Sequence, residues 1–510
     1  MSSHTENNKR IAKNTLLLYG RMLLTVGISF YSTRLILANL GVDNYGIYNV
    51  IGGFVSMFYM VSATMTQAVG RFLTFELGTG NKKKLQQTFS TSVNILLLLS
   101  LIVVLLAETV GLWFVNYKLN ISSDRMVAAN WIYQFSVLSF ILEMISVPYS
   151  ASVISHEKMG TFAFITIMKV FFILGIALLL SISPIDRLIF YGIMMFIVSA
   201  SIQLIYWIYC RRNFPECKYS IYTDREIFKE MFGFAGWNFL TTTSAMLSTQ
   251  GINIMLNMYF GTAVNAARGI AAQINGTAGA FAKNFMTSLN PQLVKSYAVQ
   301  DIEYTKSLLC RGAKFSYILL FVIALPCMIE VNFFLSIWLK EVPTYADAFI
   351  RLSLIYSLTD VLISTSETTN RATGKIRNNQ ILLCISQYII LLVSYLVLNS
   401  TKSPILTYSV LNVVYVIIFI PRVIINKPYI GITFSYYYKN VLHGIIIMTI
   451  FSTLLSLTPL YIMSEGWGRL FIVCGVSTIS IIFFSYIFVL TGNERNKIKS
   501  LIVKVTKKEV

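Results

Sequence analysis

Residues 87–115 read QTFSTSVNILLLLSLIVVLLAETVGLWFV, and Glu108 is the one charged residue among them. An α-helix rises about 1.5 Å per residue, so about 20 apolar residues cross the roughly 30 Å hydrocarbon core of a bilayer. This stretch is both long enough and apolar enough to do so. It therefore predicts a transmembrane helix.

The rest of the chain repeats this pattern. Of the 510 residues, 55% are hydrophobic and only 12% are charged, whereas soluble domains carry roughly a quarter charged residues. Fourteen apolar blocks follow one another, at 14–38, 46–70, 87–115, 126–150, 160–183, 187–210, 232–259, 264–288, 308–335, 346–370, 378–398, 404–421, 440–463 and 467–490. We therefore expect an all-α integral membrane protein with about 14 transmembrane helices.

The distribution of basic residues predicts the orientation. The N-terminal MSSHTENNKR shows no cleavable signal peptide, so we expect the first helix to direct insertion. With a cytoplasmic N-terminus, most Lys and Arg outside the spans lie on the cytoplasmic side, including NKKK at 81–84 and the tail 495–508. This asymmetry accounts for much of the net charge of +19, so that charge does not indicate nucleic-acid binding. Both termini are expected in the cytoplasm, with the basic tail near anionic lipids.

Enzyme and metal motifs are missing from the sequence. The six cysteines have no CxxC spacing, and His4, His156 and His443 are scattered, so neither a disulfide framework nor a metal site is predicted. Short loops leave no room for a catalytic or nucleotide-binding domain. The sequence predicts neither an enzyme nor a cofactor.

The two halves of the chain resemble each other. LGVDNYGIYNVIGGF (40–54) aligns with FGTAVNAARGIAAQI (260–274), and hairpin positions and loop lengths then coincide at an offset of 216 to 220 residues. Two parallel six-helix repeats are typical of alternating-access transporters, although similar hydropathy alone makes unrelated halves look alike. The predicted parts are a tail (1–13), a first bundle (14–210), a linker (211–231), a second bundle (232–425), two extra helices (426–491) and a basic tail (492–510).

The segments RLILANLGVDNYGIYNV (34–50) and QAVGRFLTFELGTGNKKKLQQTFS (67–90) resemble the polysaccharide transporter family. These Wzx-type O-antigen and capsule flippases belong to the MATE-like MOP superfamily. The resemblance implies two six-helix bundles around a central cavity in the bacterial inner membrane. It also implies export of an undecaprenyl-pyrophosphate-linked oligosaccharide from the inner to the outer leaflet, next to polysaccharide polymerase or export machinery.

Such a substrate carries an anionic pyrophosphate, which cannot cross bare hydrocarbon because a buried charge costs several kcal/mol. Cations within the spans are therefore candidate ligands, together with hydrogen-bonding groups for the sugar. Arg311, Arg351 and Glu108 lie close enough to helix ends to reach water. The predicted substrate-binding residues are Arg21, Arg34, Lys169, Arg268, Asn275, Lys283 and Lys314. For Lys169 a buried ion pair is the alternative.

The polar block 264–288 is the most informative of these spans. Arg268, Ala272, Asn275, Gly279 and Lys283 recur at helical spacing and fall on one small, polar face. The two cations are fifteen residues apart, roughly 22 Å along the axis. Arginine suits phosphate because its planar fork binds two oxygens at once. Close helix packing explains the small residues but not the charges.

Acidic residues in the spans predict coupling to an ion gradient. Glu143 and Asp360 occupy the fourth and tenth spans, which are equivalent in the two repeats, and Glu367 lies two turns beyond Asp360. Each is a candidate for binding H⁺ or Na⁺, and pairing with the intramembrane cations is the alternative.

Two other functions remain open. A MATE-like cation-coupled multidrug antiporter would share this fold but needs an acidic rather than a cationic cavity. A membrane polysaccharide polymerase would be expected to carry a large outside loop, whereas the longest outside loop, near 336–345, has about ten residues.

Overall fold

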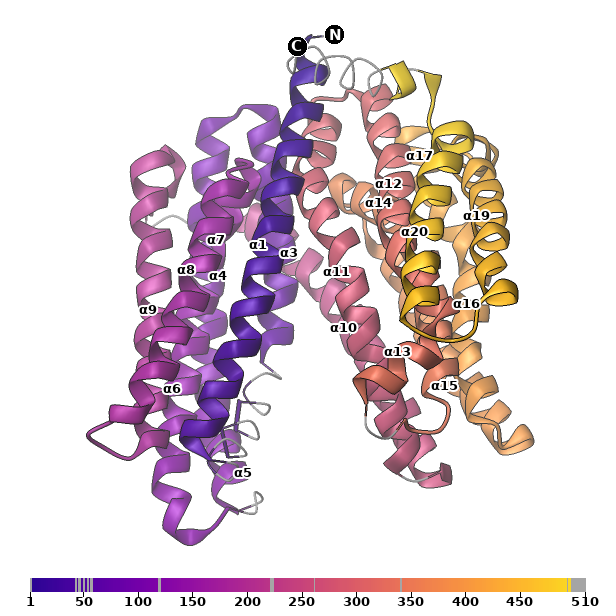
Figure 1. The fold of residues 1–510 in the computed structure, drawn as a ribbon. Helices are drawn as coiled ribbons and strands as arrows, with labels where there is room; N and C mark the ends of the chain where they lie inside the picture. Colours follow the sequence, from indigo (N-terminus) through magenta and orange to yellow (C-terminus); the bar gives the residue numbers. More distant parts are fainter. Residues whose placement is uncertain are drawn as a thin grey trace, which may run out of the picture. The chain divides into compact units, whose positions relative to one another are not determined.

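The computed structural model describes residues 2–41, 44, 47–48, 51–52, 55, 58–117, 121–220, 224–260, 262–339, 342–492 and 494–496. Throughout these residues the regular secondary structure is helical (Figure 1). The predicted all-α fold is confirmed. Residues 497–510, which make up most of the predicted basic tail, lie outside the described residues.

The chain divides into two compact units. Unit 1 comprises Met1–Thr242 and Val294–Gln300, and unit 2 comprises Thr243–Leu293 and Asp301–Val510. The helices and helical turns of unit 1 are α1 (Ser2–Leu40), α3 (Tyr59–Thr79), α4 (Lys82–Leu106), η1 (Ala107–Gly111), α5 (Leu112–Tyr117), η2 (Ser123–Arg125), α6 (Met126–Ile145), α7 (Val147–Ser155), α8 (Met159–Leu179), η3 (Leu180–Ile182), α9 (Arg187–Asn213) and η4 (Pro215–Cys217).

Two long helices, α10 (Arg225–Phe260) and α11 (Thr262–Ala298), contribute residues to both units. Pro291 stands inside α11 shortly before the chain passes from unit 2 into unit 1. The remaining elements of unit 2 are α12 (Ile302–Ile329), α13 (Val331–Trp338), α14 (Ala346–Thr373), α15 (Arg377–Thr401), α16 (Pro404–Ile424), α17 (Lys427–Ile430), α18 (Phe434–Tyr437), η5 (Tyr438–Leu442), α19 (His443–Ile462), α20 (Trp467–Phe484) and η6 (Ser485–Val489).

Among the described residues, 11 helical segments are long and apolar enough to cross a membrane. The protein is therefore a multi-pass membrane protein. The other three predicted spans, 46–70, 232–259 and 264–288, fall at least in part on α3, α10 and α11, where Ser, Thr, Gly and Asn interrupt the apolar run. The first of them also differs in its bounds, because α3 continues to Thr79 and part of 46–58 is not described.

Local sequence explains where several helices begin and end. Gly80 ends α3 with φ +76°, a conformation that glycine adopts without strain, and Asn81 then caps α4 by accepting a hydrogen bond from the backbone N–H of Lys84 at 3.0 Å. Asp186 caps α9 in the same way and also pairs with Arg125 at 2.6 Å. The connections that lead into α4 and α9 are thus fixed by caps.

The two units use the same helix pairings. In unit 1, α6 packs against α9, α8 against α9, and α4 against α6. In unit 2, α14 packs against α16, α15 against α16, and α12 against α14. Each unit 2 helix is the one that the sequence repeat aligns with its unit 1 counterpart. In unit 2, α19 and α20 also lie side by side (Figure 1). Gly444 of α19 packs against the backbone of Phe488 in η6.

Candidate functional site

Unit 2 contains a cavity of about 740 Å³ within its membrane-spanning region. Its lining residues come from α10, α11, α14, α15 and α16. The residues that line it are Ala245, Thr249, Gln250, Asn253, Ile254, Met258, Arg268, Gly269, Ala272, Asn275, Gly276, Ser353, Tyr356, Gln387, Tyr408, Leu411 and Tyr415.

Arg268 is the charged group of this cavity. Among the lining residues that the structure describes, it alone carries a formal charge. Its Nη1 donates a hydrogen bond to Oδ1 of Asn253 at 2.6 Å, and its guanidinium lies 5.3 Å from the ring centroid of Tyr408. Both partners are neutral, so they orient the guanidinium without cancelling its charge. The cavity is therefore electropositive.

Amide and hydroxyl groups surround Arg268. Asn275 accepts a hydrogen bond from Ser357 at 2.7 Å, and Gln387 donates one to the hydroxyl of Tyr415 at 3.3 Å. The rings of Tyr356 and Tyr415 meet edge to face, with centroids 4.5 Å apart. Such a lining offers both donors and acceptors to a hydroxyl-rich ligand, and flat aromatic surfaces to its apolar faces.

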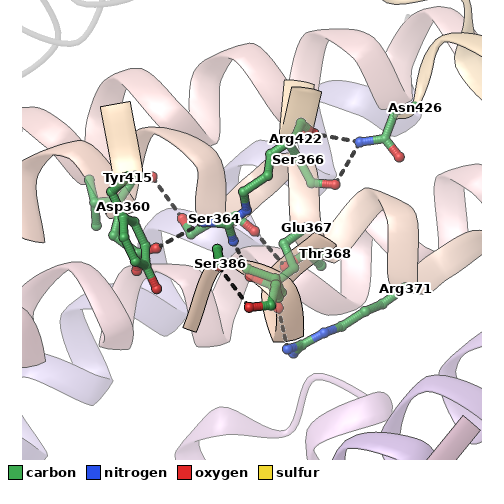
Figure 2. A network of polar contacts seen from close by, with 12 residues as sticks. Asp360, Ser364, Ser366, Glu367, Thr368, Arg371, Ser386, Tyr415, Arg422 and Asn426 are labelled. Carbon is green, nitrogen blue, oxygen red and sulfur yellow. Dashed lines mark hydrogen bonds and ion pairs between the residues drawn. The ribbon is translucent and has the colours of Figure 1, made fainter. Parts of the chain in front are cut away.

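The same unit contains a network of ionised side chains, Asp360, Glu367, Arg371 and Arg422 (Figure 2). Arg422 of α16 is only 2% exposed and binds two carboxylates of α14, Asp360 at 3.3 Å and Glu367 at 2.9 Å. Glu367 also pairs with Arg371 at 2.5 Å. A buried cation needs such partners because its desolvation costs several kcal/mol. The negative charges of the two acids therefore cancel the positive charges of the two arginines.

Tyr415 connects this network to the cavity. Its ring lines the cavity, and the guanidinium of Arg422 lies 5.9 Å from the ring centroid. Tyr408, Tyr415 and Arg422 follow one another at seven-residue intervals on α16, which places them on one helix face. Arg268, the tyrosines and the ionised network therefore form one continuous polar stripe through unit 2.

Unit 1 contains a smaller cavity of about 320 Å³. Glu143 accepts a hydrogen bond from the hydroxyl of Tyr59 at 2.7 Å, and Lys169 lies 3.8 Å from the other carboxylate oxygen. Both charged side chains are 35% exposed. The lining residues are Tyr48, Gly52, Val55, Tyr59, Phe135, Ser136, Ser139, Glu143, Lys169, Gly192, Met195, Val198 and Ser199.

The two cavities occupy matching places in the two repeats. Glu143 of α6 corresponds to Asp360 of α14, and Lys169 of α8 corresponds to Gln387 of α15, both within the predicted range of offsets. In unit 1 the acid pairs with the cation across its own cavity. In unit 2 the lysine position is an amide, so the acid pairs with Arg422 instead. The two units therefore differ in cavity charge.

The other predicted ligands lie elsewhere. Lys283 is exposed on α11, two turns beyond the part that lines the unit 2 cavity. Lys314 is buried on α12, where it pairs with Glu494 at 3.0 Å. On α1, Arg34 is exposed, and Arg21 lies over the ring of Phe162 at 5.1 Å. The structure thus brings Arg268 and Asn275 into one cavity, and Lys169 and Glu143 into the other.

Comparison with known proteins gives a fold but no sequence relative. No family model matches the chain, and no curated protein matches its sequence. A MATE transporter in the straight conformation superposes with a TM-score of 0.70 at 10% identity, covering 83% of this chain and 96% of that one. The chain has the MATE transporter fold.

Two further structures bear on the cavity. An outward-facing multidrug resistance MATE family transporter of the MOP superfamily matches with a TM-score of 0.67 at 10% identity, over 83% of this chain and 94% of that one. A MOP superfamily transporter from Pyrococcus furiosus matches with a TM-score of 0.64 at 10% identity, over 82% and 94%. It is described as having a binding pocket of reverse polarity that suggests a different function. Transporters with this fold therefore differ in pocket charge.

Several site residues were missed by the sequence analysis. Arg422 falls just past the predicted span 404–421, so it was not counted among the intramembrane cations. Tyr408, Tyr415 and Gln387 lack any motif, and aromatic residues are common in membrane proteins for other reasons. The seven-residue spacing of Tyr408, Tyr415 and Arg422 was the one signal available.

Proposed function

We propose that this protein is a flippase that exports an undecaprenyl-pyrophosphate-linked oligosaccharide, an O-antigen or capsular repeat unit, from the inner to the outer leaflet of the bacterial cytoplasmic membrane. The observation that carries the proposal is the lining of the unit 2 cavity, in which Arg268 is the one formal charge among the described residues. Amide, hydroxyl and phenol groups make up most of the rest of the polar lining.

The chemistry of Arg268 suits the anionic linker. A guanidinium can bind two oxygens of a pyrophosphate at once, and this charge-assisted pairing is stronger in a cavity shielded from bulk water. Asn253 holds one nitrogen of the fork and the ring of Tyr408 supports its face, so the side chain is oriented before the ligand arrives. The lipid tail of such a substrate can remain in the bilayer while only its polar part enters the protein.

The sugar part has partners as well. Asn275 and Gln387 each make one hydrogen bond among the described residues and retain further bonding capacity, and Tyr356 and Tyr415 offer ring faces. Lys169 and Glu143, in the cavity of unit 1, provide a second, electrically neutral polar site. Arg21, Arg34, Lys283 and Lys314 remain candidate ligands from sequence, but the proposal does not depend on them.

Coupling to an ion gradient is part of the proposal. Glu143, Asp360 and Glu367 are the acids next to the two cavities, and each is a candidate for binding H⁺ or Na⁺. We further propose that both termini lie in the cytoplasm, and that a polymerase or export complex receives the product.

A cation-coupled multidrug antiporter is the second candidate, and the similarity to MATE transporters favours it. A cationic drug could be bound by the carboxylate of Glu143 in the unit 1 cavity. In the unit 2 cavity it would lie near the positive charge of Arg268. Like charges in a cavity of low dielectric constant repel strongly. The charge of the larger cavity therefore favours an anionic substrate.

The test replaces Arg268. In proteoliposomes that contain a fluorescent lipid-linked oligosaccharide, Arg268→Ala should abolish flipping, and Arg268→Lys should restore it only in part because an ammonium lacks the planar fork. Arg377→Ala, which removes an exposed cation at the start of α15, is the matched control and should flip normally. Normal flipping by Arg268→Ala would overturn the proposal, and export of a cationic dye by the wild type would support the antiporter.

A further inference from the structure

Asp360 has the most solvent-exposed side chain of the ionised network. Its side chain is 41% exposed, whereas that of Glu367 is 20% exposed and that of Arg422 only 2%. It also has the longest ion pair of the three, at 3.3 Å against 2.9 Å and 2.5 Å. A small cation can therefore reach Asp360 without breaking the pairs of Glu367.

The network is electrically balanced only while Asp360 is ionised. The titratable and charged groups near this carboxylate, among the described residues, are Tyr356, Glu367 and Arg371 on its own helix and Tyr415 and Arg422 on α16. With both acids ionised, their charges cancel those of the two arginines. A proton or Na⁺ on Asp360 leaves the network with one net positive charge, held mainly by Arg422.

This charge would lie close to the cavity. Ser353 and Tyr356 line the cavity from α14, and Asp360 follows them on the same helix, about 10 Å along the axis from Ser353. The guanidinium of Arg422 lies against the ring of Tyr415, and that of Arg268 against the ring of Tyr408, seven residues or about 10 Å away along α16. Over about 10 Å, at an effective dielectric constant near 20, a unit charge changes the affinity roughly tenfold for each charge on the ligand.

We propose that cation binding at Asp360 and anion binding at Arg268 are positively linked, so that each raises the affinity of unit 2 for the other. The inference rests on the proposed function in one respect, namely that the cavity takes an anion. Linkage is reciprocal, so the anionic substrate raises the affinity of Asp360 for H⁺ or Na⁺ by the same factor. The cation and the anion then bind together rather than in competition, and the cation offsets part of the charge that the substrate carries.

The experiment measures the affinity of the purified full-length protein in nanodiscs for farnesyl pyrophosphate, a short isoprenoid pyrophosphate. Asp360→Asn mimics the neutralised carboxylate, so it should bind this probe, which carries two or more negative charges, at least roughly tenfold more tightly than the wild type at pH 8 and low Na⁺. Raising Na⁺ at constant ionic strength, or lowering the pH, should tighten binding to the wild type. The same change should have little effect on Asp360→Asn.

Glu6→Gln is the matched control. Glu6 lies in unit 1 and pairs with Arg10 at 3.1 Å, and both side chains are more than half exposed to solvent. It should leave the affinity for the probe unchanged. If Asp360→Asn does not fold, the Na⁺ and pH series on the wild type alone still tests the sign of the linkage.

Two failures can be told apart. If the wild type does not bind farnesyl pyrophosphate under any condition, or if Arg268→Ala binds it equally well, the proposed function is wrong. If Arg268 is needed for binding but Asp360→Asn binds no more tightly, or if Na⁺ and acid weaken binding to the wild type, the positive linkage is wrong and the two ligands compete or act independently.

Discussion

Nζ of Lys295 lies 2.6 Å from Oε1 of Glu157, and this ion pair attaches the last turns of α11 to the turn that follows α7. The carboxylate is 5% exposed and the ammonium 26%. Next to it, Gly78 of α3 lies so close to α11 that an added Cβ would stand 2.7 Å from Cβ of Ala298. Because α11 otherwise belongs to unit 2, these contacts hold its end within unit 1.

Lys295→Ala should therefore destabilise the protein. It leaves the buried carboxylate of Glu157 without its cation, which costs roughly 2 kcal/mol once the partial exposure of Lys295 is allowed for. Thermal unfolding in detergent should show a lower Tm for Lys295→Ala. The double variant Lys295→Ala/Glu157→Gln should recover part of the loss. Lys306→Ala, which breaks a pair with the exposed Glu303, is the control, and an equal effect of the two single variants would contradict this prediction.

A second prediction concerns acid stability at the linker. Glu216 is 8% exposed and its Oε1 lies 2.5 Å from Nε2 of His156, whose ring stacks on Phe214 with centroids 4.0 Å apart. Burial raises the pKa of Glu216, but the hydrogen bond and charge of His156, together with a backbone hydrogen bond, outweigh burial, so the net pKa is lowered from 4.5. A lowered pKa in the folded state stabilises the protein above the unfolded pKa, and this stabilisation is lost as the pH falls through the folded pKa.

We therefore expect the Tm to fall as the pH drops below about 4.5, and Glu216→Gln to show a flatter profile there. His156→Phe keeps the stacking on Phe214 but removes the hydrogen bond, so it should flatten the profile in the same way. Asp301→Asn, which changes a helix-capping carboxylate outside the linker, serves for comparison. If Tm falls with pH in the same way for the wild type and for Glu216→Gln, the contact between Glu216 and His156 does not contribute to acid stability.

Lys314 provides a third prediction. Its ammonium is 3% exposed, and it binds Glu494 at 3.0 Å and the carbonyl oxygen of Val489 at 3.2 Å, which fixes the segment after α20 to α12. Lys314→Met should lower the Tm because, among the described residues, it leaves Glu494 with one ion pair, the looser pair to Arg311 at 3.2 Å. Adding Glu494→Gln should restore much of the Tm. If the single variant instead keeps the Tm but loses affinity for farnesyl pyrophosphate, Lys314 binds substrate.

The sequence predicted the fold better than the site. Apolar blocks of about 20 residues report directly on the bilayer, so the helical spans followed from hydropathy alone. Arg268 was predicted as a ligand because a charge inside a span is costly and needs a reason, and Asn275 because it shares a helix face with Arg268; both line the unit 2 cavity. Arg422 was missed because it lies one residue past the predicted end of its span. Which partner each ion takes also depended on tertiary contacts, since Glu143 pairs with Lys169 whereas Asp360 pairs with Arg422.

The last prediction concerns the energy that drives export. The pyrophosphate linker carries roughly two negative charges, and outward movement of a negative charge from a negative interior is favourable by about 2.3 kcal/mol per 100 mV. Two charges therefore gain about 4–5 kcal/mol at 100 mV, and a cation bound with the substrate at Asp360 would reduce this gain by about half.

We expect flipping from the leaflet that represents the cytoplasmic side to accelerate when a potassium diffusion potential makes that side negative. Asp360→Asn should respond more steeply to the potential than the wild type, because no cation travels with its substrate. The measurement uses proteoliposomes with a fluorescent lipid-linked oligosaccharide, and Arg268→Ala supplies the inactive baseline. Flipping that ignores the imposed potential and both ion gradients would identify a passive scramblase, and the coupling role of the carboxylates would have to be abandoned.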